Sequence, residues 1–230
     1  MRMDPRELFG DMDIYLFDQL LKGRIPKDKR ILDAGCGSGR NLVYFFRTGY
    51  DVHAVDRSAD AIRDVRMLAR KLAPHWPDDH ARVESIEKLS FANDSFDVVI
   101  SNAVLHFAAS EANFHQMVHE MWRVLRPGGL LFVRLASRIG MEDKIEVLGG
   151  EHYKLPDGSI RFLVDEAQLH RTAEKLQGIL LEPIKTVNVG NQRCMTTWCL
   201  KKPHILFFDP IEEIQPDGEH SSHQATWPET

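Results

Sequence analysis

The sequence predicts an α/β fold in which a doubly wound, mostly parallel sheet of seven strands ends in an antiparallel edge strand. Three observations support this prediction. Short apolar segments alternate with helical segments between residues 30 and 135, which is the order of parallel strands joined by crossover helices. A glycine-rich turn follows the first of these strands directly. Two apolar segments near the end of the chain flank a short turn that contains Gly190-Asn191, a spacing typical of an antiparallel pair.

The first half of the chain supplies most of these elements. The helices are indicated by an apolar stripe with a cap or stop signal, and the strands by short, continuously apolar runs. The expected order is a helix over 13–22, strand 30–33, helix 41–47, strand 51–56, helix 59–72, weak strand 81–86, strand 96–101, helix 111–125 and strand 130–135. Pro127-Gly128-Gly129 is expected to separate the last helix from the last strand.

The alternation of strands and helices stops after residue 136. Residues 153–164 are expected to form a hairpin around a Pro-Asp-Gly turn. A helix over 165–176 and strands over 180–189 and 193–202 should follow. We expect residues 1–208 to form a single domain in which residues 137–165 are an inserted lid over the acceptor. The remaining residues, 209–230, should form an acidic, flexible tail.

Composition excludes several classes of protein. The net charge of −5 arises in the tail, which has six acidic residues and no Lys or Arg, so the rest of the chain is about neutral. No basic footprint for a nucleic acid is therefore present. No apolar run is long enough to span a membrane, and the first residues do not lead into the apolar core of a secretory signal. The three cysteines form no disulfide framework, so the cytoplasm is the expected compartment.

The most informative segment runs from Ile31 to Asn41, ILDAGCGSGRN in one-letter code. Its three glycines, which allow a sharp turn and close approach of a ligand, are Gly35, Gly37 and Gly39. A dinucleotide-binding turn would place glycine or alanine at position 40, where this chain has Arg40. This difference disfavours a nicotinamide oxidoreductase.

Two carboxylates accompany this turn. Asp33 stands two residues ahead of the first glycine, where it would repel a pyrophosphate but would suit a ligand with an ammonium or sulfonium charge. Asp56 ends the second strand, where a carboxylate can accept hydrogen bonds from the hydroxyls of a ribose. The combination of turn and carboxylates predicts a site for a cationic, ribose-containing cofactor.

Four segments between residues 30 and 135 form a more specific combination. They are the glycine turn over 32–39, Val55-Asp56, the segment 96–106 and the segment 123–129. Together they resemble the class I S-adenosylmethionine-dependent methyltransferases, in the small-molecule branch that includes the methyltransferase-11 and tellurite-resistance-like enzymes. The resemblance implies a Rossmann-like fold, S-adenosylmethionine as the cofactor and S-adenosylhomocysteine as the product.

The resemblance also implies which residues hold each part of the cofactor. Asp33 and Gly35 would lie near the methionine ammonium, and Asn102 would line the methionine moiety. Asp56 would hold the ribose hydroxyls. The adenine would lie beside Arg57, Ser85 and Ile86, and Tyr15 would cover the methionine end of the cofactor.

Ser85 departs from the family pattern, in which an aspartate often accepts a hydrogen bond from the adenine amino group. A serine hydroxyl can accept the same bond, but it carries no charge and should bind more weakly. On this basis, an aspartate introduced at position 85 should tighten cofactor binding.

Methyl transfer from a sulfonium needs mainly alignment and exclusion of water, and a base only where the acceptor must lose a proton. His106, which follows the strand over 96–101, is either such a base or a histidine packed under a loop with a bond to a backbone carbonyl. Arg134 ends an apolar strand, where it either binds an anionic acceptor or pairs with a carboxylate. His115 and His119 lie four apart on a helix, but no third ligand accompanies them, so no metal site is expected.

Two hypotheses for function follow. The first is a methyltransferase for a small-molecule acceptor, and the second is a regulatory protein that binds the cofactor without transferring the methyl group. Arg134, Arg138 and Arg161 could converge on an anionic acceptor beneath the lid. In the competing interpretation the lid is an ordinary surface hairpin whose arginines pair with Glu142, Asp143 and Glu146.

Overall fold

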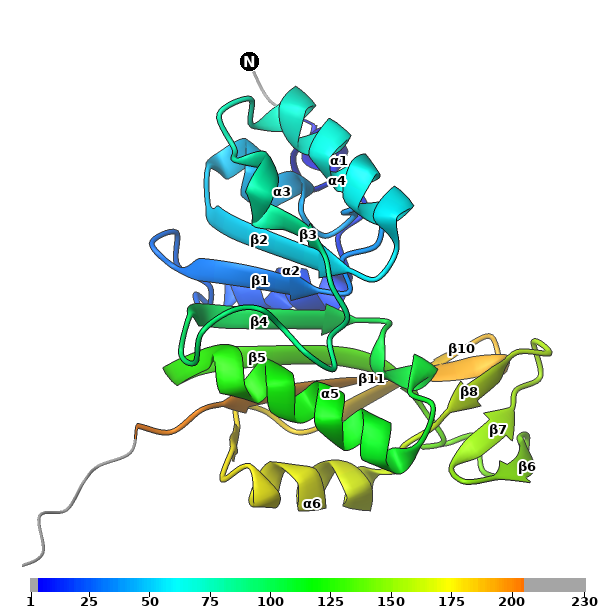
Figure 1. Ribbon diagram of the computed structural model, residues 1–230. Helices are drawn as coiled ribbons and strands as arrows, with labels where there is room; N and C mark the ends of the chain where they lie inside the picture. The colour runs from blue at the N-terminus through cyan, green and yellow to red at the C-terminus, as the bar shows by residue number, and fades with distance from the viewer. Residues whose placement is uncertain (1–3, 205–230) are drawn as a thin grey trace, which may run out of the picture.

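The computed structural model describes residues 4–204, and the predicted acidic tail lies outside this range. Within the described residues the main sheet has the strand order β10-β11-β5-β4-β1-β2-β3, with short β9 also paired to β11. The five neighbouring strands β5, β4, β1, β2 and β3 are parallel to one another. Strand β11 is antiparallel to both of its neighbours, β5 and β10. The predicted doubly wound sheet with an antiparallel edge is therefore confirmed (Figure 1).

The elements have the following bounds. The helices are α1 (Pro5–Phe9), α2 (Ile14–Leu21), α3 (Val43–Thr48), α4 (Ala59–Leu72), α5 (Glu111–Val124) and α6 (Glu166–Lys175). The strands are β1 (Arg30–Ala34), β2 (Asp51–Asp56), β3 (Ala81–Val83), β4 (Phe96–Asn102), β5 (Leu125–Ser137), β6 (Glu146–Gly149), β7 (His152–Lys154), β8 (Ile160–Phe162), β9 (Ile179–Leu180), β10 (Lys185–Val189) and β11 (Arg193–Lys201). No helix among these residues is long and apolar enough to cross a membrane.

Two hydrophobic clusters lie on opposite faces of the sheet, because successive strand residues point to opposite sides. On β5, Leu131 and Val133 pack against α5 and α6, whereas Leu130 and Phe132 belong to the cluster that contains α2, α3 and α4. Large, fully buried residues belong to both clusters: Phe114 and Trp198 to the first, and Phe45 to the second. Burial on both faces explains why the central strands are continuously apolar.

Two strands differ from their predicted bounds. The strand expected over 130–135 begins at Leu125, because Pro127-Gly128-Gly129 forms an irregularity within β5 instead of a turn before it. The strand expected over 180–189 is divided into β9 and β10, with Pro183 between them. Proline cannot donate to a ladder, so it interrupts the pairing to β11.

The segment after β5 forms a separate three-stranded sheet in the order β6-β7-β8. The expected hairpin is present as β7 and β8, and β6 extends it by one strand that the sequence did not predict. Figure 1 shows this small sheet beyond the carboxyl end of β4 and beside β10. It therefore lies at the edge of the main sheet where the parallel strands end.

Candidate functional site

A cavity of about 380 Å³ lies at the carboxyl ends of β1, β2 and β4. The strand order reverses here, since β2 and β4 lie on opposite sides of β1, and ligands of doubly wound sheets bind at such a point. Seven of the ten predicted cofactor residues line the cavity, namely Gly35, Gly37, Asp56, Arg57, Ser85, Ile86 and Asn102. Tyr15, Asp33 and Gly39 do not line it.

The glycines of the turn serve different purposes. Gly37 has φ of +53° and open space where a side chain would be, so its backbone faces the cavity. Its N–H donates to Asp56 Oδ2 at 2.9 Å, which fixes that carboxylate at the cavity wall. At Gly35, φ is +83° and a Cβ would lie 2.4 Å from Val104 Cγ2. Gly39 instead packs against the α4 residues Leu68 and Val65, so its role is structural.

Asp33 lies behind this turn as a buried carboxylate. Its exposure is 1%, and neither carboxylate oxygen has a hydrogen-bond partner among the described residues. Burial raises its pKa to about 7, with Arg40 acting to lower it and Asp56 to raise it. An unpaired buried carboxylate is costly unless a positive charge is nearby. Asp33 therefore fits a cofactor whose cationic end lies against the glycine turn.

The predicted adenine end of the cavity contains a carboxylate that the sequence analysis missed. Ser85 donates its hydroxyl hydrogen bond to Glu87, which also accepts from Asn113 Nδ2 at 3.1 Å. Burial acts to raise the pKa of Glu87, but these hydrogen bonds outweigh burial and place the pKa below its usual value. Glu87 lines the cavity beside Ser85, and it supplies there the negative charge that Ser85 lacks.

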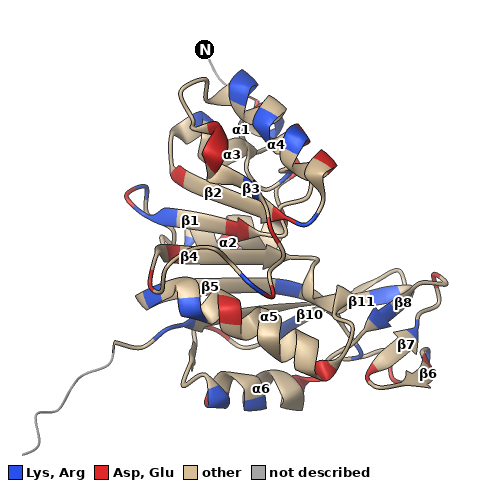
Figure 2. Cartoon of the chain, viewed as in Figure 1, with Lys and Arg blue, Asp and Glu red and all other residues tan. Residues whose placement is uncertain are grey.

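A second cavity of about 390 Å³ adjoins the first, and the two share Arg40, Asn102, Ala103 and Phe107 as lining residues. It lies between the end of β5, the β7–β8 turn and the β10–β11 pair. The charged residues that line it are four arginines and two aspartates: Arg40, Arg134, Arg161, Arg193, Asp13 and Asp157. Figure 2 shows basic positions on β8, in the small sheet. This cavity has the place and the charge expected of an acceptor site.

Arg134 is held by an ion pair inside the second cavity. Its Nε lies 2.9 Å from Asp13 Oδ2, and both side chains are only 10% exposed. Its Nη1 donates to Thr197 Oγ1 at 3.1 Å, and its guanidinium lies 4.4 Å from the ring centre of Tyr15. The structure therefore favours the carboxylate pair over the anion-binding role. It also places Tyr15 against Arg134 and outside the lining of the first cavity.

His106 lines the second cavity but is a poor base. Its Nδ1 accepts a hydrogen bond from the backbone N–H of Ala136 at 3.1 Å, so the ring proton of the neutral form lies on Nε2. Burial lowers the pKa to about 4, with contributions from Arg161 and Arg193. The histidine is thus neutral at physiological pH and offers an N–H donor. The prediction of a base near neutral pH was wrong, as was the expected bond to a backbone carbonyl.

Of the two lid arginines, Arg161 lines the second cavity, as the anion-binding alternative requires, whereas Arg138 matches neither alternative. Arg138 pairs with Asp165, not with Glu142, Asp143 or Glu146, and it does not line the second cavity. Arg161 lies 4.8 Å from the ring centre of Phe107 and donates to its neighbouring backbone carbonyl. Arg193, from β11, was missed because the antiparallel register that brings it to the cavity is not encoded in any local motif.

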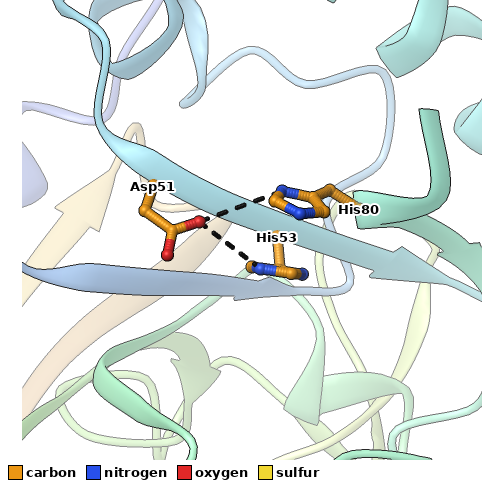
Figure 3. A group of neighbouring side chains, drawn as sticks. All are labelled: Asp51, His53 and His80. Carbon is orange, nitrogen blue, oxygen red and sulfur yellow. Dashed lines mark ion pairs between the residues drawn. The ribbon is translucent and has the colours of Figure 1, made fainter. Parts of the chain in front are cut away.

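A different group of potential metal ligands lies at the amino end of β2 (Figure 3). Asp51 Oδ1 is 3.5 Å from His53 Nε2 and 3.9 Å from His80 Nδ1. The two imidazole rings are stacked, with centroids 3.7 Å apart. Arg30 Nη2 lies 2.8 Å from His53 Nε2, so a guanidinium occupies the lone pair that a metal would need. Burial lowers the pKa of His53 to about 3, and the nearby His80, Arg30 and Arg82 also contribute to this lowering.

Comparison with known proteins gives results consistent with this geometry. Residues 32–133 match the sequence profile of a family described as a methyltransferase domain. A malonyl-acyl-carrier protein O-methyltransferase of Enterobacter lignolyticus is 37% identical over 120 residues, which are 51% of this chain and 44% of that protein. A ubiquinone biosynthesis O-methyltransferase of Chelativorans sp. is 32% identical over 62% of this chain and 55% of its own length. The chain thus spans about half the length of these curated relatives.

Among solved structures, the 1,6-didemethyltoxoflavin-N1-methyltransferase of Burkholderia thailandensis has a similar fold. Its TM-score is 0.61 at 18% identity, with 82% of this chain and 76% of that chain covered. That crystal structure contains bound 1,6-didemethyltoxoflavin and S-adenosylhomocysteine. At this identity, the likeness concerns the fold of the two chains.

Proposed function

We propose that the chain is a class I S-adenosylmethionine-dependent methyltransferase that transfers a methyl group from S-adenosylmethionine to a small-molecule acceptor. The match of residues 32–133 to a methyltransferase domain supports this proposal. The observation that carries this proposal is the cavity at the carboxyl ends of β1, β2 and β4. It combines an open glycine backbone at Gly37 with the carboxylates of Asp56 and Glu87.

The chain's own residues would bind and orient the two reactants. When bound, the cofactor supplies an activated methyl group on a sulfonium. Asp56 would accept hydrogen bonds from the ribose hydroxyls, since each carboxylate oxygen makes only one bond here, to Gly37 N–H or Ser58 N–H. Asp33 would stabilise the cationic end from behind the turn. Glu87 and Ser85 would hold the adenine amino group.

The acceptor would occupy the second cavity, with residues 137–165 as the lid of the single domain over 1–208. Four arginines against two aspartates leave two positive charges in excess among the charged residues that line this cavity. An anionic acceptor is attracted to such a site. The names of the two curated relatives describe O-methyltransferases, and we propose oxygen as the methylated atom here too.

The test is formation of S-adenosylhomocysteine by the full chain, measured by mass spectrometry with S-adenosylmethionine and a panel of acids, phenols, amines and thiols. Product that depends on an acceptor supports the proposal. Binding of S-adenosylmethionine with no product from any acceptor contradicts it, and favours a regulatory protein that binds the cofactor.

We also propose that the protein acts in the cytoplasm. Cys36, Cys194 and Cys199 are free thiols buried in the fold, and unpaired cysteines are typical of a reducing compartment. Fractionation of the cells that produce the protein would test this, and recovery outside the cytoplasm would contradict it.

A further inference from the structure

We propose that the acceptor is a carboxylate with an apolar body, that Arg161 and Arg193 bind its anionic end, and that the product is a methyl ester. This inference rests on the proposed methyl transfer and names its substrate class. Three observations carry it: the distribution of charge in the second cavity, the absence of a suitable base among the residues lining both cavities, and the apolar residues in the lining of the second cavity.

The charge argument singles out Arg161 and Arg193. The Arg134 charge is already neutralised by Asp13 at 2.9 Å. Among the described residues no carboxylate lies within 4.0 Å of the Arg161 guanidinium, and the Arg193 guanidinium meets Asp157 only at 3.7 Å. These two arginines come from different sheets, Arg161 from β8 and Arg193 from β11, and both line the cavity. A planar carboxylate between two guanidinium groups satisfies both.

His106 provides a second indication of positive potential in this cavity. Arg161 and Arg193 both contribute to the lowering of its pKa, so both guanidinium groups act on the same point in the cavity. A bound anion would offset the positive potential that the two guanidinium groups produce there. The Nε2–H of His106 is available as a further donor, because Nδ1 is occupied by the Ala136 N–H.

The lining of both cavities lacks a base strong enough for a neutral hydroxyl acceptor. Neither cavity is lined by lysine or tyrosine. Burial raises the pKa of the Cys36 thiol, and burial lowers that of His106 to about 4. The remaining groups are carboxylates, whose usual pKa of about 4 is about 6 units below that of a phenol. An acceptor that is already ionised at neutral pH needs no base, and a carboxylate meets this condition.

The remaining lining residues favour an acceptor with an apolar body. Leu155, Met195 and Val189 line the second cavity, and Phe107 lines the junction of the two cavities. Phe107 and Val189 are 52% and 38% exposed, so their apolar surface is accessible to a ligand. A molecule with a carboxylate at the arginines and apolar carbon against these side chains would match both parts of the cavity.

The reaction then balances without a proton. An oxygen of the carboxylate attacks the methyl carbon, a C–O bond forms and the C–S bond breaks. The electron pair of the broken bond remains on sulfur, which becomes the neutral thioether of S-adenosylhomocysteine. The anionic acceptor becomes a neutral ester, and no proton is released. A hydroxyl acceptor would instead release one proton for each methyl transferred.

The first experiment measures binding by calorimetry on the full chain, with octanoate and phenylacetate as probes and octanamide and phenylacetamide as uncharged counterparts. We expect the carboxylates to bind at least tenfold more tightly than the amides, with or without S-adenosylhomocysteine. Arg161→Met and Arg193→Met should each weaken carboxylate binding at least tenfold. Arg138→Met is the matched control, because Arg138 pairs with Asp165 outside the cavity.

Several results of this experiment would overturn the carboxylate site. They are a lack of carboxylate binding, equal affinity for acid and amide, or equal weakening by Arg138→Met. The comparison of acid with amide uses the unaltered protein, so it does not depend on how well any variant folds.

The second experiment follows methyl transfer from S-adenosylmethionine labelled in its methyl group, with a panel of carboxylic acids and phenols. A methyl ester should release its label as volatile methanol on treatment with base, and no proton should appear for each S-adenosylhomocysteine formed in weakly buffered solution. If the label is not released by base, and one proton appears for each methyl transferred, the carboxylate proposal is overturned but the proposed methyl transfer stands. Formation of no S-adenosylhomocysteine would overturn the proposed function and the ester step, while the binding experiment decides separately on the carboxylate site.

Discussion

Cofactor affinity should depend on pH through a single buried residue, Asp33. In the structure this carboxylate is 1% exposed and has no hydrogen-bond partner among the described residues. Burial raises its pKa to about 7. The ionised form, however, is the one that attracts a cationic ligand. Binding of S-adenosylmethionine should therefore drive Asp33 to give up its proton.

The magnitude follows from this pKa. At pH 6, one unit below it, about a tenth of the protein carries an ionised Asp33, so affinity should be roughly tenfold lower than at pH 8, equivalent to about 1.4 kcal/mol. Calorimetry at pH 6 in two buffers of different ionisation enthalpy should show release of nearly one proton on binding. The release should shrink as pH rises above 7.

Asp33→Asn is the matched variant, since it keeps the shape of the side chain without the titration. Its affinity should be weaker than that of the parent at pH 8 and should not change between pH 6 and pH 8. Its stability gives a control for folding. Because the pKa of Asp33 is higher in the folded state than in the unfolded state, the free energy of unfolding of the parent should fall as pH rises from about 4 to 7. The Asp33→Asn variant should lack this fall. An affinity of the parent that is constant from pH 6 to pH 8, without proton release, would refute the reasoning.

Three further predictions concern other residues. Asp56→Ala should weaken S-adenosylmethionine binding by about 1–3 kcal/mol, because the ribose hydroxyls lose a charged acceptor, and unchanged affinity by calorimetry would remove Asp56 from the site. Ser85→Asp should weaken binding, contrary to the expectation from sequence, because it places a second carboxylate beside Glu87; tighter binding would show that Glu87 does not face the adenine. His53, with its pKa lowered to about 3, contributes stability that is present above pH 6.5 and lost as pH falls toward 3. Urea unfolding should show that the free energy of unfolding falls by about 2 kcal/mol between pH 7 and pH 5 because of this residue. An equal fall in the His53→Gln variant would show that His53 is not its cause.

The order of the sheet could be predicted because its signals are local. Each parallel strand is a short apolar run between helical segments. Strands such as β4 and β5 are buried on both faces, so their residues are apolar without alternation. The strand β6 gave no such signal, because all four of its residues are exposed. The irregularity at Gly128 within β5 was also missed. Its N–H donates to Lys202 O at 2.7 Å, and that contact joins segments that no local pattern relates.

The lining of the first cavity was predictable to the extent that its residues stand at or directly after the ends of strands. Gly35, Asp56 and Asn102 stand at the ends of β1, β2 and β4, and parallel strands bring such positions to one edge of the sheet. Glu87 lies in an irregular loop without a periodic pattern, so its place beside Ser85 becomes apparent only in three dimensions. In the sequence, Arg40 is apparent only as a break in the glycine pattern, although in the structure it lines both cavities.

Arg134 illustrates what sequence reasoning can and cannot decide about a buried charge. A guanidinium at the end of an apolar strand must have a partner, and that requirement was evident from the sequence alone. The identity of the partner depends on the N-terminal segment. Asp13 caps α2 by accepting from the N–H of Tyr15, and the same carboxylate reaches Arg134 at 2.9 Å. With the Arg134 charge neutralised within the chain, the recognition of an anion that we propose would fall to Arg161 and Arg193, which have weaker partners among the described residues. The proposed binding charge would thus come from the small sheet and from the antiparallel strand β11, and not from the glycine turn and the ends of β1, β2 and β4 that line the first cavity.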